Sequence, residues 1–319
     1  MMSECGGGGQ SGIVHTRSSF SGFFCSNGAS PQIIDSMIVS DIAMNAESSS
    51  PLAEPGFQRL LEILRGMDGV AVACSGGLDS SLLLAAARLA LDERVLALTL
   101  VTPYMASQEI AEAKALTARL GARHRVLELP MPEEIAANPP DRCYRCKRTL
   151  FAELQTVAAA EGFTWLADGS NRDDLADYRP GMRALRELGI RSPLLEADLG
   201  KAEIRRYARA LDLPVWNHPA SACLLTRLPH DTAVRPELLR RVEAAEQALR
   251  ALEFRTVRVR CHDDLARIEL ERAEQARLLD ERVGGQVVEA LIACGFRHVT
   301  LDLQGYRMGS FNVIAPATE

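Results

Sequence analysis

The segment Ser75-Gly76-Gly77-Leu78-Asp79-Ser80 has residue types and spacing that suit phosphate binding. Paired glycines let backbone N–H groups approach an anion closely, and a helix that begins here points its positive end at the same place. Ser75 and Ser80 could donate hydroxyl groups to phosphate oxygens, and Asp79 could hold Mg²⁺. The segment lacks a Walker A lysine and a GxGxxG pattern, which disfavours P-loop kinases and Rossmann dehydrogenases. An ordinary glycine-containing turn is the alternative.

Two cysteines, Cys143 and Cys146, form a CxxC pair. In a reducing compartment, closely spaced cysteines indicate metal or redox chemistry. One such pair is compatible with half a zinc site, with a redox pair and with two thiols on one helix face. The spacing alone leaves these possibilities open.

Several arginines are candidates for binding an anionic substrate. Arg258 and Arg260 alternate with valines in segment 255–261, so a strand here would carry both guanidinium groups on one face. Guanidinium groups bind carboxylates and phosphates through paired hydrogen bonds. Arg227 and Arg307 are further candidates, and a solvated strand face is the alternative. The six histidines show no metal-ligand spacing.

The elements that must position these residues follow from the apolar pattern. The expected strands are 69–75, 95–101, 124–129 and 164–170, and the expected helices are 57–67, 80–91, 107–121 and 147–161. Because each strand is apolar on both faces, the pattern predicts a parallel sheet covered by helices on both sides. The expected fold class is a doubly wound α/β domain that places the phosphate segment at the end of its first strand.

The C-terminal part has a different pattern. It predicts a helix over 236–252, strands over 255–261 and 265–270, a helix near 271–293 and a strand over 298–303. The predicted organisation is a disordered Gly/Ser-rich tail over 1–54, an α/β domain over 55–215 and a smaller α+β domain over 216–319. An upstream start codon, with Met37 or Met44 beginning the functional chain, is the alternative explanation of the tail.

Composition excludes several classes of protein. The 319 residues are 47% hydrophobic and 24% charged, as in ordinary globular proteins, and no apolar run reaches the roughly 18 residues of a membrane span. The formal net charge of −6 argues against a non-specific nucleic-acid binder. Eight cysteines are too few for a disulfide scaffold, and the chain opens without a signal-peptide pattern. A soluble, cytoplasmic protein is expected.

The phosphate segment resembles the signature of the PP-loop ATP pyrophosphatases, which transfer AMP to a carbonyl oxygen and release pyrophosphate. Segments 168–174 (DGSNRDD) and 192–214, which contains Lys201, resemble the second and third motifs of that superfamily. The resemblance implies ATP and Mg²⁺ as cofactors. The residues that it implies for nucleotide binding are Ser75, Gly76, Gly77, Asp79, Ser80, Asn171, Asp173 and Lys201.

Segments 216–231 and 301–312 are similar to LarE-type sulfur transferases within that superfamily. This resemblance implies an enzyme that adenylates a carboxylate of pyridinium-3,5-biscarboxylic acid mononucleotide and converts it to a thiocarboxylate, in nickel-pincer cofactor biosynthesis. It makes Cys223 the sulfur-bearing catalytic residue. It also implies phosphate or substrate contacts from Arg258, Arg260, Arg307 and Glu246, although a surface position is the ordinary explanation of a glutamate in mid-helix. A homo-oligomer, a hexamer in the family, is expected.

The resemblance gives the CxxC pair a third partner. Three thiolates from Cys143, Cys146 and Cys223 can hold a [4Fe–4S] cluster and leave one iron open for an extra sulfide, whereas structural zinc normally has four ligands. Some LarE-like proteins have this three-cysteine arrangement, and others sacrifice the sulfur of the cysteine and retain dehydroalanine. The cluster is the prediction, and sacrifice of Cys223 is its main rival.

Two other functions fit parts of the pattern. A tRNA-thiolating PP-loop enzyme also combines a CxxC pair with a later cysteine, and segments 142–148 and 201–260 are locally basic. A non-catalytic nucleotide-binding or iron-storage module is the rival from a different class. ATP-dependent release of pyrophosphate excludes that module, and an RNA-binding assay tests the thiolating enzyme.

Overall fold

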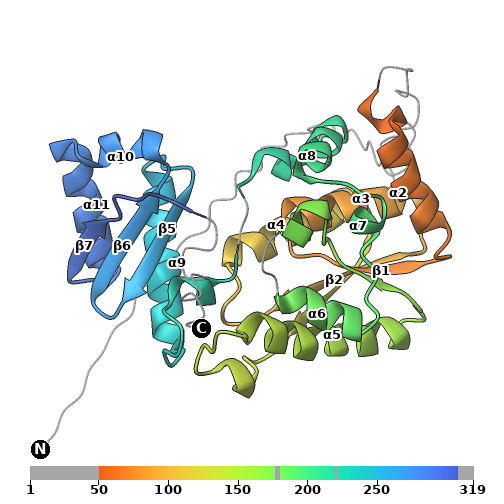
Figure 1. Cartoon of the computed structure of the whole chain (residues 1–319), viewed down its shortest axis with the longest axis horizontal. Helices are drawn as coiled ribbons and strands as arrows, with labels where there is room; N and C mark the ends of the chain where they lie inside the picture. The colour runs from red at the N-terminus through yellow and green to blue at the C-terminus, as the bar shows by residue number, and fades with distance from the viewer. Residues whose placement is uncertain (1–49, 177–179, 220–221, 308–319) are drawn as a thin grey trace, which may run out of the picture.

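The computed structural model describes residues 50–176, 180–219 and 222–307, which fold as an α/β part followed by a smaller α+β part (Figure 1). Most of the predicted tail, residues 1–49, lies outside the described residues. Residues 50–54 belong to the folded part, because Pro51–Ala53 form a 3-10 turn and Glu54 accepts hydrogen bonds from Arg206 and Tyr207.

Four parallel strands form the sheet of the α/β part, in the order β3-β2-β1-β4. They are β1 (Val70–Ala73), β2 (Val95–Val101), β3 (Arg123–Glu128) and β4 (Leu166–Ala167). The helices are α2 (Pro55–Arg65), α3 (Leu78–Leu91), α4 (Ser107–Arg119), α5 (Arg142–Ala160), α6 (Pro180–Glu187), α7 (Pro193–Glu196) and α8 (Lys201–Ala210). The predicted fold class is confirmed.

The central strands bury both faces, as their continuous apolar sequences predict. Val70 and Val72 of β1 point into a core formed with α2, α3 and α8, whereas Ala71 points into a second core formed with α5 and α6. Figure 1 shows the same layers, with α2, α3 and α7 on one side of the sheet and α5 and α6 on the other. This alternation follows from the two-residue period of a strand.

The edge strand β3 differs from its prediction. Its residues are exposed or half-buried, whereas an apolar strand covered on both faces was expected. The reason is its place at the end of the sheet, where Arg123 and Arg125 both donate to Glu161 at 2.8 Å. Charged side chains on an edge strand discourage pairing with other chains.

The α+β part contains a three-stranded mixed sheet in the order β5-β6-β7, with α9 (Pro236–Ala251) packed against β5. The strands are β5 (Val257–His262), β6 (Leu265–Leu270) and β7 (His298–Leu301). The single helix expected near 271–293 is two helices, α10 (Arg272–Leu278) and α11 (Glu281–Ala293). Asp280 separates them, because its side chain accepts the Val283 N–H at 3.0 Å and starts a new helix.

The two parts share one hydrophobic core. Tyr104, Ile135 and Leu150 of the α/β part pack in the same cluster as the apolar face of α9 and the inner face of β5. The buried Asn138 adds polar contacts, since its amide donates to the Leu228 and Pro229 carbonyls at 3.2 and 2.7 Å. The boundary between 215 and 216 stays a prediction. None of the helices that the structure describes is long and apolar enough to cross a membrane.

Candidate nucleotide and sulfur site

The phosphate segment forms a tight loop between β1 and α3. The Ser75 N–H donates to Ser80 Oγ at 3.2 Å, and Ser80 Oγ donates to the Gly77 carbonyl at 3.1 Å. Gly76 has a φ of +81°, and a Cβ at this position would lie 2.2 Å from the Glu109 carbonyl oxygen. Only glycine fits these two conditions, and the loop therefore packs its backbone directly against α4, which contains Glu109.

The segment after β4 packs directly on this loop. A Cβ on Gly169 would lie 2.9 Å from the Ser80 nitrogen, so the two backbones touch. Asn171 donates from Nδ2 to Asp79 Oδ1 at 3.4 Å. Two of the three predicted nucleotide motifs therefore meet at the carboxyl end of β1 and β4, where open α/β sheets bind ligands.

Lys201, the first residue of α8, brings the third motif to the same place. Its ammonium group forms an ion pair with Asp79, and its backbone N–H donates to Asp173 Oδ2 at 2.9 Å. Both side chains of the pair are partly exposed, so a phosphate can reach them. Mg²⁺ is commonly bound by one or two carboxylates plus substrate phosphates, and Asp79 provides such a carboxylate beside the loop.

Asp168 is a residue of this region that the sequence analysis did not assign. It is buried, and it accepts hydrogen bonds from the Ser170 and Ser192 hydroxyls, each at 2.6 Å. Lys147 Nζ lies 3.9 Å from its carboxylate. Ser192 and Lys147 are far from Asp168 in the sequence, so local spacing contains no signal for this cluster.

The three cysteines lie where two segments meet. Cys143 and Cys146 lie near the start of α5, which begins at Arg142 and not at the predicted residue 147, and Cys223 directly precedes the short 3-10 helix Leu224–Arg227. Tyr104 connects the two segments. Its hydroxyl lies 3.1 Å from Cys146 Sγ, and its carbonyl accepts the Leu224 N–H at 2.9 Å.

The pKa values of the thiols show that they interact. Burial raises the pKa of Cys146 to about 12, and Cys223 and Cys143 add to that rise. Burial and Cys143 also raise the pKa of Cys223, whereas Arg142 and Arg227 lower it. The described residues nevertheless contain no group of three or more Cys, His, Asp or Glu side chains arranged to hold a metal ion. The thiols as placed here do not form the ligand set of a cluster.

Arg227 and Glu246 form a buried ion pair beneath Cys223. Each is 2% exposed, and Nε of the arginine donates to Oε1 of the glutamate at 2.8 Å. Arg227 also donates to the Ala222 and Cys223 carbonyls at 2.7 and 3.2 Å. The surface position considered for Glu246 is therefore wrong, and the geometry shows Arg227 holding the backbone around the cysteine.

The strand arginines are buried as well. Arg258 and Arg260 are each 5% exposed, so the alternative of a solvated strand face is wrong. Arg260 donates to Glu269 at 2.7 Å and to the Thr226 carbonyl at 2.6 Å, and Arg258 lies over the Tyr306 ring. Exposed Arg307 donates instead to the Gln304 side chain. Their predicted substrate contacts remain predictions.

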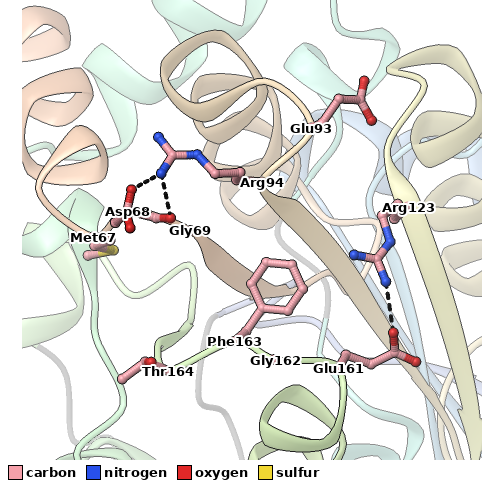
Figure 2. Close-up of a pocket in the computed structure, with 10 residues that line it drawn as sticks. All are labelled: Met67, Asp68, Gly69, Glu93, Arg94, Arg123, Glu161, Gly162, Phe163 and Thr164. Atoms are coloured by element: carbon pink, nitrogen blue, oxygen red, sulfur yellow. Dashed lines mark hydrogen bonds and ion pairs between the residues drawn. The ribbon is translucent and has the colours of Figure 1, made fainter.

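A cavity of about 390 Å³ lies at the opposite, amino-terminal end of the sheet (Figure 2). Figure 2 shows Arg94 directed at Asp68 and Arg123 directed at Glu161, with Phe163 between the two pairs. Because both guanidinium groups already have carboxylate partners and β1 separates this end from the phosphate loop, the cavity is distinct from the nucleotide site.

Sequence comparison with known proteins is consistent with a nucleotide site at the phosphate loop. Residues 62–149, which include the phosphate loop and the CxxC pair, match the family model described as NAD synthase. Pyridinium-3,5-bisthiocarboxylic acid mononucleotide synthase of Lactiplantibacillus plantarum is 39% identical over 261 residues, which cover 79% of this chain and 92% of that protein. The chain belongs to the LarE family. LarE-family proteins are ATP-using sulfur transferases of the PP-loop type.

Two further relatives are uncharacterized proteins. One, from Synechocystis sp., is 39% identical over 266 residues and covers 82% of this chain and 98% of its own length. The other, from Methanocaldococcus jannaschii, is 30% identical over 240 residues and covers 75% of this chain and 90% of its own length. Together with the match to the L. plantarum protein, these matches extend well beyond the phosphate loop and across both parts of the fold.

Proposed function

We propose that this LarE-family chain uses ATP to activate a carboxylate of pyridinium-3,5-biscarboxylic acid mononucleotide and converts it to a thiocarboxylate with sulfur delivered at Cys223. The observation that carries the proposal is the convergence of three separate segments on Asp79, through Asn171 and Lys201. The name of the L. plantarum relative supports the substrate.

The first step makes a leaving group. A carboxylate oxygen of the substrate attacks the α-phosphorus of ATP, the bond to the bridging oxygen breaks, and pyrophosphate leaves. Lys201 and the N–H groups at the start of α3 stabilise the negative charge of the departing pyrophosphate. Mg²⁺, when held by Asp79 and the phosphates, neutralises part of the same charge.

The second step transfers sulfur. A sulfur nucleophile at Cys223 attacks the carbonyl carbon of the acyl adenylate, and AMP leaves with the bonding electrons. If the sulfur is that of Cys223 itself, the Cβ–S bond then breaks as the α-proton is lost. The thiocarboxylate is released, and dehydroalanine remains at position 223. Arg227 holds the backbone on both sides of this residue.

The sequence predicts two possible sources of the sulfur, an extra sulfide on a cluster and the sulfur atom of Cys223 itself. The electrostatic coupling among the three thiols supports one shared site, whereas their arrangement does not complete a metal ligand set. The two steps above need no cluster. The iron content of the protein after anaerobic reconstitution distinguishes a cluster from sacrifice of Cys223. A cluster absorbs at about 400 nm, and the cluster prediction is wrong if Cys143→Ala binds as much iron as the parent chain.

Pyrophosphate release and intact mass test the proposal together. Asp79→Asn should abolish release of pyrophosphate in the presence of the dicarboxylate, because it removes the carboxylate between Lys201 and Asn171. Asp92→Asn is the control, since Asp92 is an exposed residue at the other end of α3.

After one turnover, a mass loss of about 34 Da marks sacrifice of Cys223, and an unchanged mass with repeated turnover marks a renewable sulfur. Absence of any thiocarboxylate product contradicts the proposal.

A further inference from the structure

We infer that Arg205 is a positioning residue of the proposed reaction, which anchors the segment before Cys223 to the helix that carries Lys201. The inference rests on the proposed function. Arg205 lies in the third nucleotide motif but is not one of the residues predicted to bind the nucleotide.

The first turn of α8 is part of the nucleotide site. Lys201 forms an ion pair with Asp79, and its N–H donates to Asp173 Oδ2 at 2.9 Å. Glu203 caps the same turn, because its carboxylate accepts the Gly200 N–H at 2.8 Å. A nucleotide held at Asp79 and Lys201 therefore fixes this end of the helix.

Arg205 lies one turn further along α8 and contacts a different segment. Its guanidinium group donates from Nη1 to the Trp216 carbonyl at 2.9 Å and from Nη2 to the His218 carbonyl at 3.0 Å. Both carbonyls belong to the segment that leads to Cys223. A planar guanidinium with N–H groups directed at two acceptors fixes orientation as well as distance, which a lysine ammonium does not.

Two further contacts hold this segment between α8 and α4. The Arg209 guanidinium lies over the Trp216 ring at 5.0 Å from its centre. His218 Nδ1 lies 3.6 Å from the carboxylate of Glu112, a residue of α4. The segment is therefore packed on both helices, and Arg205 joins its backbone to α8.

The other side of Cys223 has separate anchors. Arg227 donates to the Cys223 carbonyl, and the Tyr104 carbonyl accepts the Leu224 N–H. Arg205 thus connects the N-terminal approach to Cys223 with the helix that meets the nucleotide. The acyl adenylate must meet the sulfur before it meets water, since a reactive intermediate is otherwise hydrolysed. Loss of Arg205 should therefore separate adenylation from sulfur transfer.

The first test measures pyrophosphate and thiocarboxylate in one single-turnover reaction of the full chain with ATP, Mg²⁺ and the dicarboxylate. Arg205→Met should release pyrophosphate within about twofold of the parent rate, but its yield of thiocarboxylate per pyrophosphate should fall about tenfold. In the missing fraction, water attacks the carbonyl carbon of the acyl adenylate, AMP leaves, and the free acid is regenerated. Arg206→Met is the matched control, because the next residue of α8 pairs instead with Glu54. Its yield should equal that of the parent chain.

Hydrogen exchange gives a second readout that needs no turnover. A peptide covering 214–219 contains the Trp216 and His218 N–H groups, which donate to the Leu213 and Val215 carbonyls at 3.1 and 3.0 Å. These amides should exchange about tenfold faster in Arg205→Met than in the parent chain or in Arg206→Met. ATP and Mg²⁺, added without the dicarboxylate, should slow their exchange in the parent chain and in Arg206→Met but not in Arg205→Met.

The two readouts separate this role from a purely structural one. If Arg205 only stabilises the fold, pyrophosphate and thiocarboxylate decrease together. An unchanged yield of thiocarboxylate per pyrophosphate, or an effect of ATP on these amides that survives in Arg205→Met, overturns the inference. Should Arg205→Met fail to fold, Arg205→Lys provides the same test with a loss of about threefold, because it keeps the charge without the planar donors. If the parent chain forms no thiocarboxylate, the proposed function fails, while the exchange rates still decide the role of Arg205.

Discussion

The charged side chains near Cys223 are buried. Arg227, Glu246, Arg258 and Arg260 are each at most 5% exposed. Sequence alone identified the arginines as chemically important, and it offered Glu246 as a substrate contact with a surface position as the alternative. The sequence does not show whether each arginine donates to a carboxylate or to a backbone carbonyl, because the acceptors lie in distant segments.

The Arg227–Glu246 pair should dominate the acid stability of the α+β part. Burial alone raises the pKa of Glu246, but Arg227, Arg258 and Arg250 lower it more, so its pKa lies below the usual 4.5. The stabilisation is complete above pH 4.5 and is lost as the pH falls toward the folded-state pKa. Glu246→Gln should lower the free energy of unfolding by about 3 kcal/mol at pH 7, because it leaves a buried guanidinium uncompensated.

Urea unfolding at several pH values checks this prediction. The difference between the parent chain and Glu246→Gln should be constant from pH 7 to pH 5 and should shrink below pH 4.5. Glu237→Gln, on an exposed turn of the same helix, should change the stability by less than about 0.5 kcal/mol. A difference that persists unchanged at pH 3.5 would show that the carboxylate is not the cause.

Lys201 should act in the adenylation step. Lys201→Met removes the cation beside Asp79 and should slow pyrophosphate release by about a hundredfold, the size expected for loss of one electrostatic contact in a transition state. A coupled pyrophosphate assay measures the rate. Lys114→Met, on the exposed surface of α4, is the control and should match the parent chain. Equal rates in the two variants contradict the assignment of Lys201.

At the scale of elements, the sequence predicted the central sheet well and the less regular parts poorly. The strands β2 and β6 begin and end at the predicted residues, since β2 is almost wholly apolar and β6 alternates apolar residues with Arg267 and Glu269. The expected helix near 271–293 failed because Asp280 caps a second helix within it. The exposure of β3 depends on strand order, which the pattern of one strand does not contain.

The turn after β1 has no room for a side chain at Gly76. Gly76→Ala should both destabilise the chain and abolish ATP binding, because the new Cβ would lie 2.2 Å from the Glu109 carbonyl oxygen and force the loop to move. Gly162→Ala is a matched control, since its φ of +85° is similar and nothing lies within 4 Å of the added atom. The control should cost only about 1 kcal/mol for the backbone conformation. Urea unfolding and ATP binding by calorimetry measure the two effects, and equal losses in both variants would refute the steric argument.

At the scale of the whole molecule, the shared core ties the sulfur site to the sheet. Sequence analysis predicted two domains and three segments that form the nucleotide site. It missed the contact between the parts, because Tyr104 and Asn138 belong to no motif and meet their partners only in the folded chain.

Asn138 offers a test of this connection. Asn138→Ala should lower the free energy of unfolding by about 2 to 4 kcal/mol, because it opens a cavity and removes hydrogen bonds to the segment after Arg227. Calorimetry of the full chain provides the measurement. Thr156→Ala, an exposed change on α5, should have little effect. A loss as small as that of the control would show that the two parts are not coupled through Asn138.

The pairing of β1 with β2 also fixes the relative position of the segments that follow the two strands. The Cys74 N–H donates to the Leu98 carbonyl and the Thr99 hydroxyl donates to the Cys74 carbonyl, both at 2.8 Å, so the ends of the two strands are locked side by side. One strand leads to the nucleotide loop and the other to Tyr104 and the thiols. These hydrogen bonds therefore fix the start of the nucleotide loop relative to the start of the segment that leads to Tyr104. For the proposed reaction, a change that slides β1 against β2 would shift the bound nucleotide relative to Tyr104 and the thiol that it contacts.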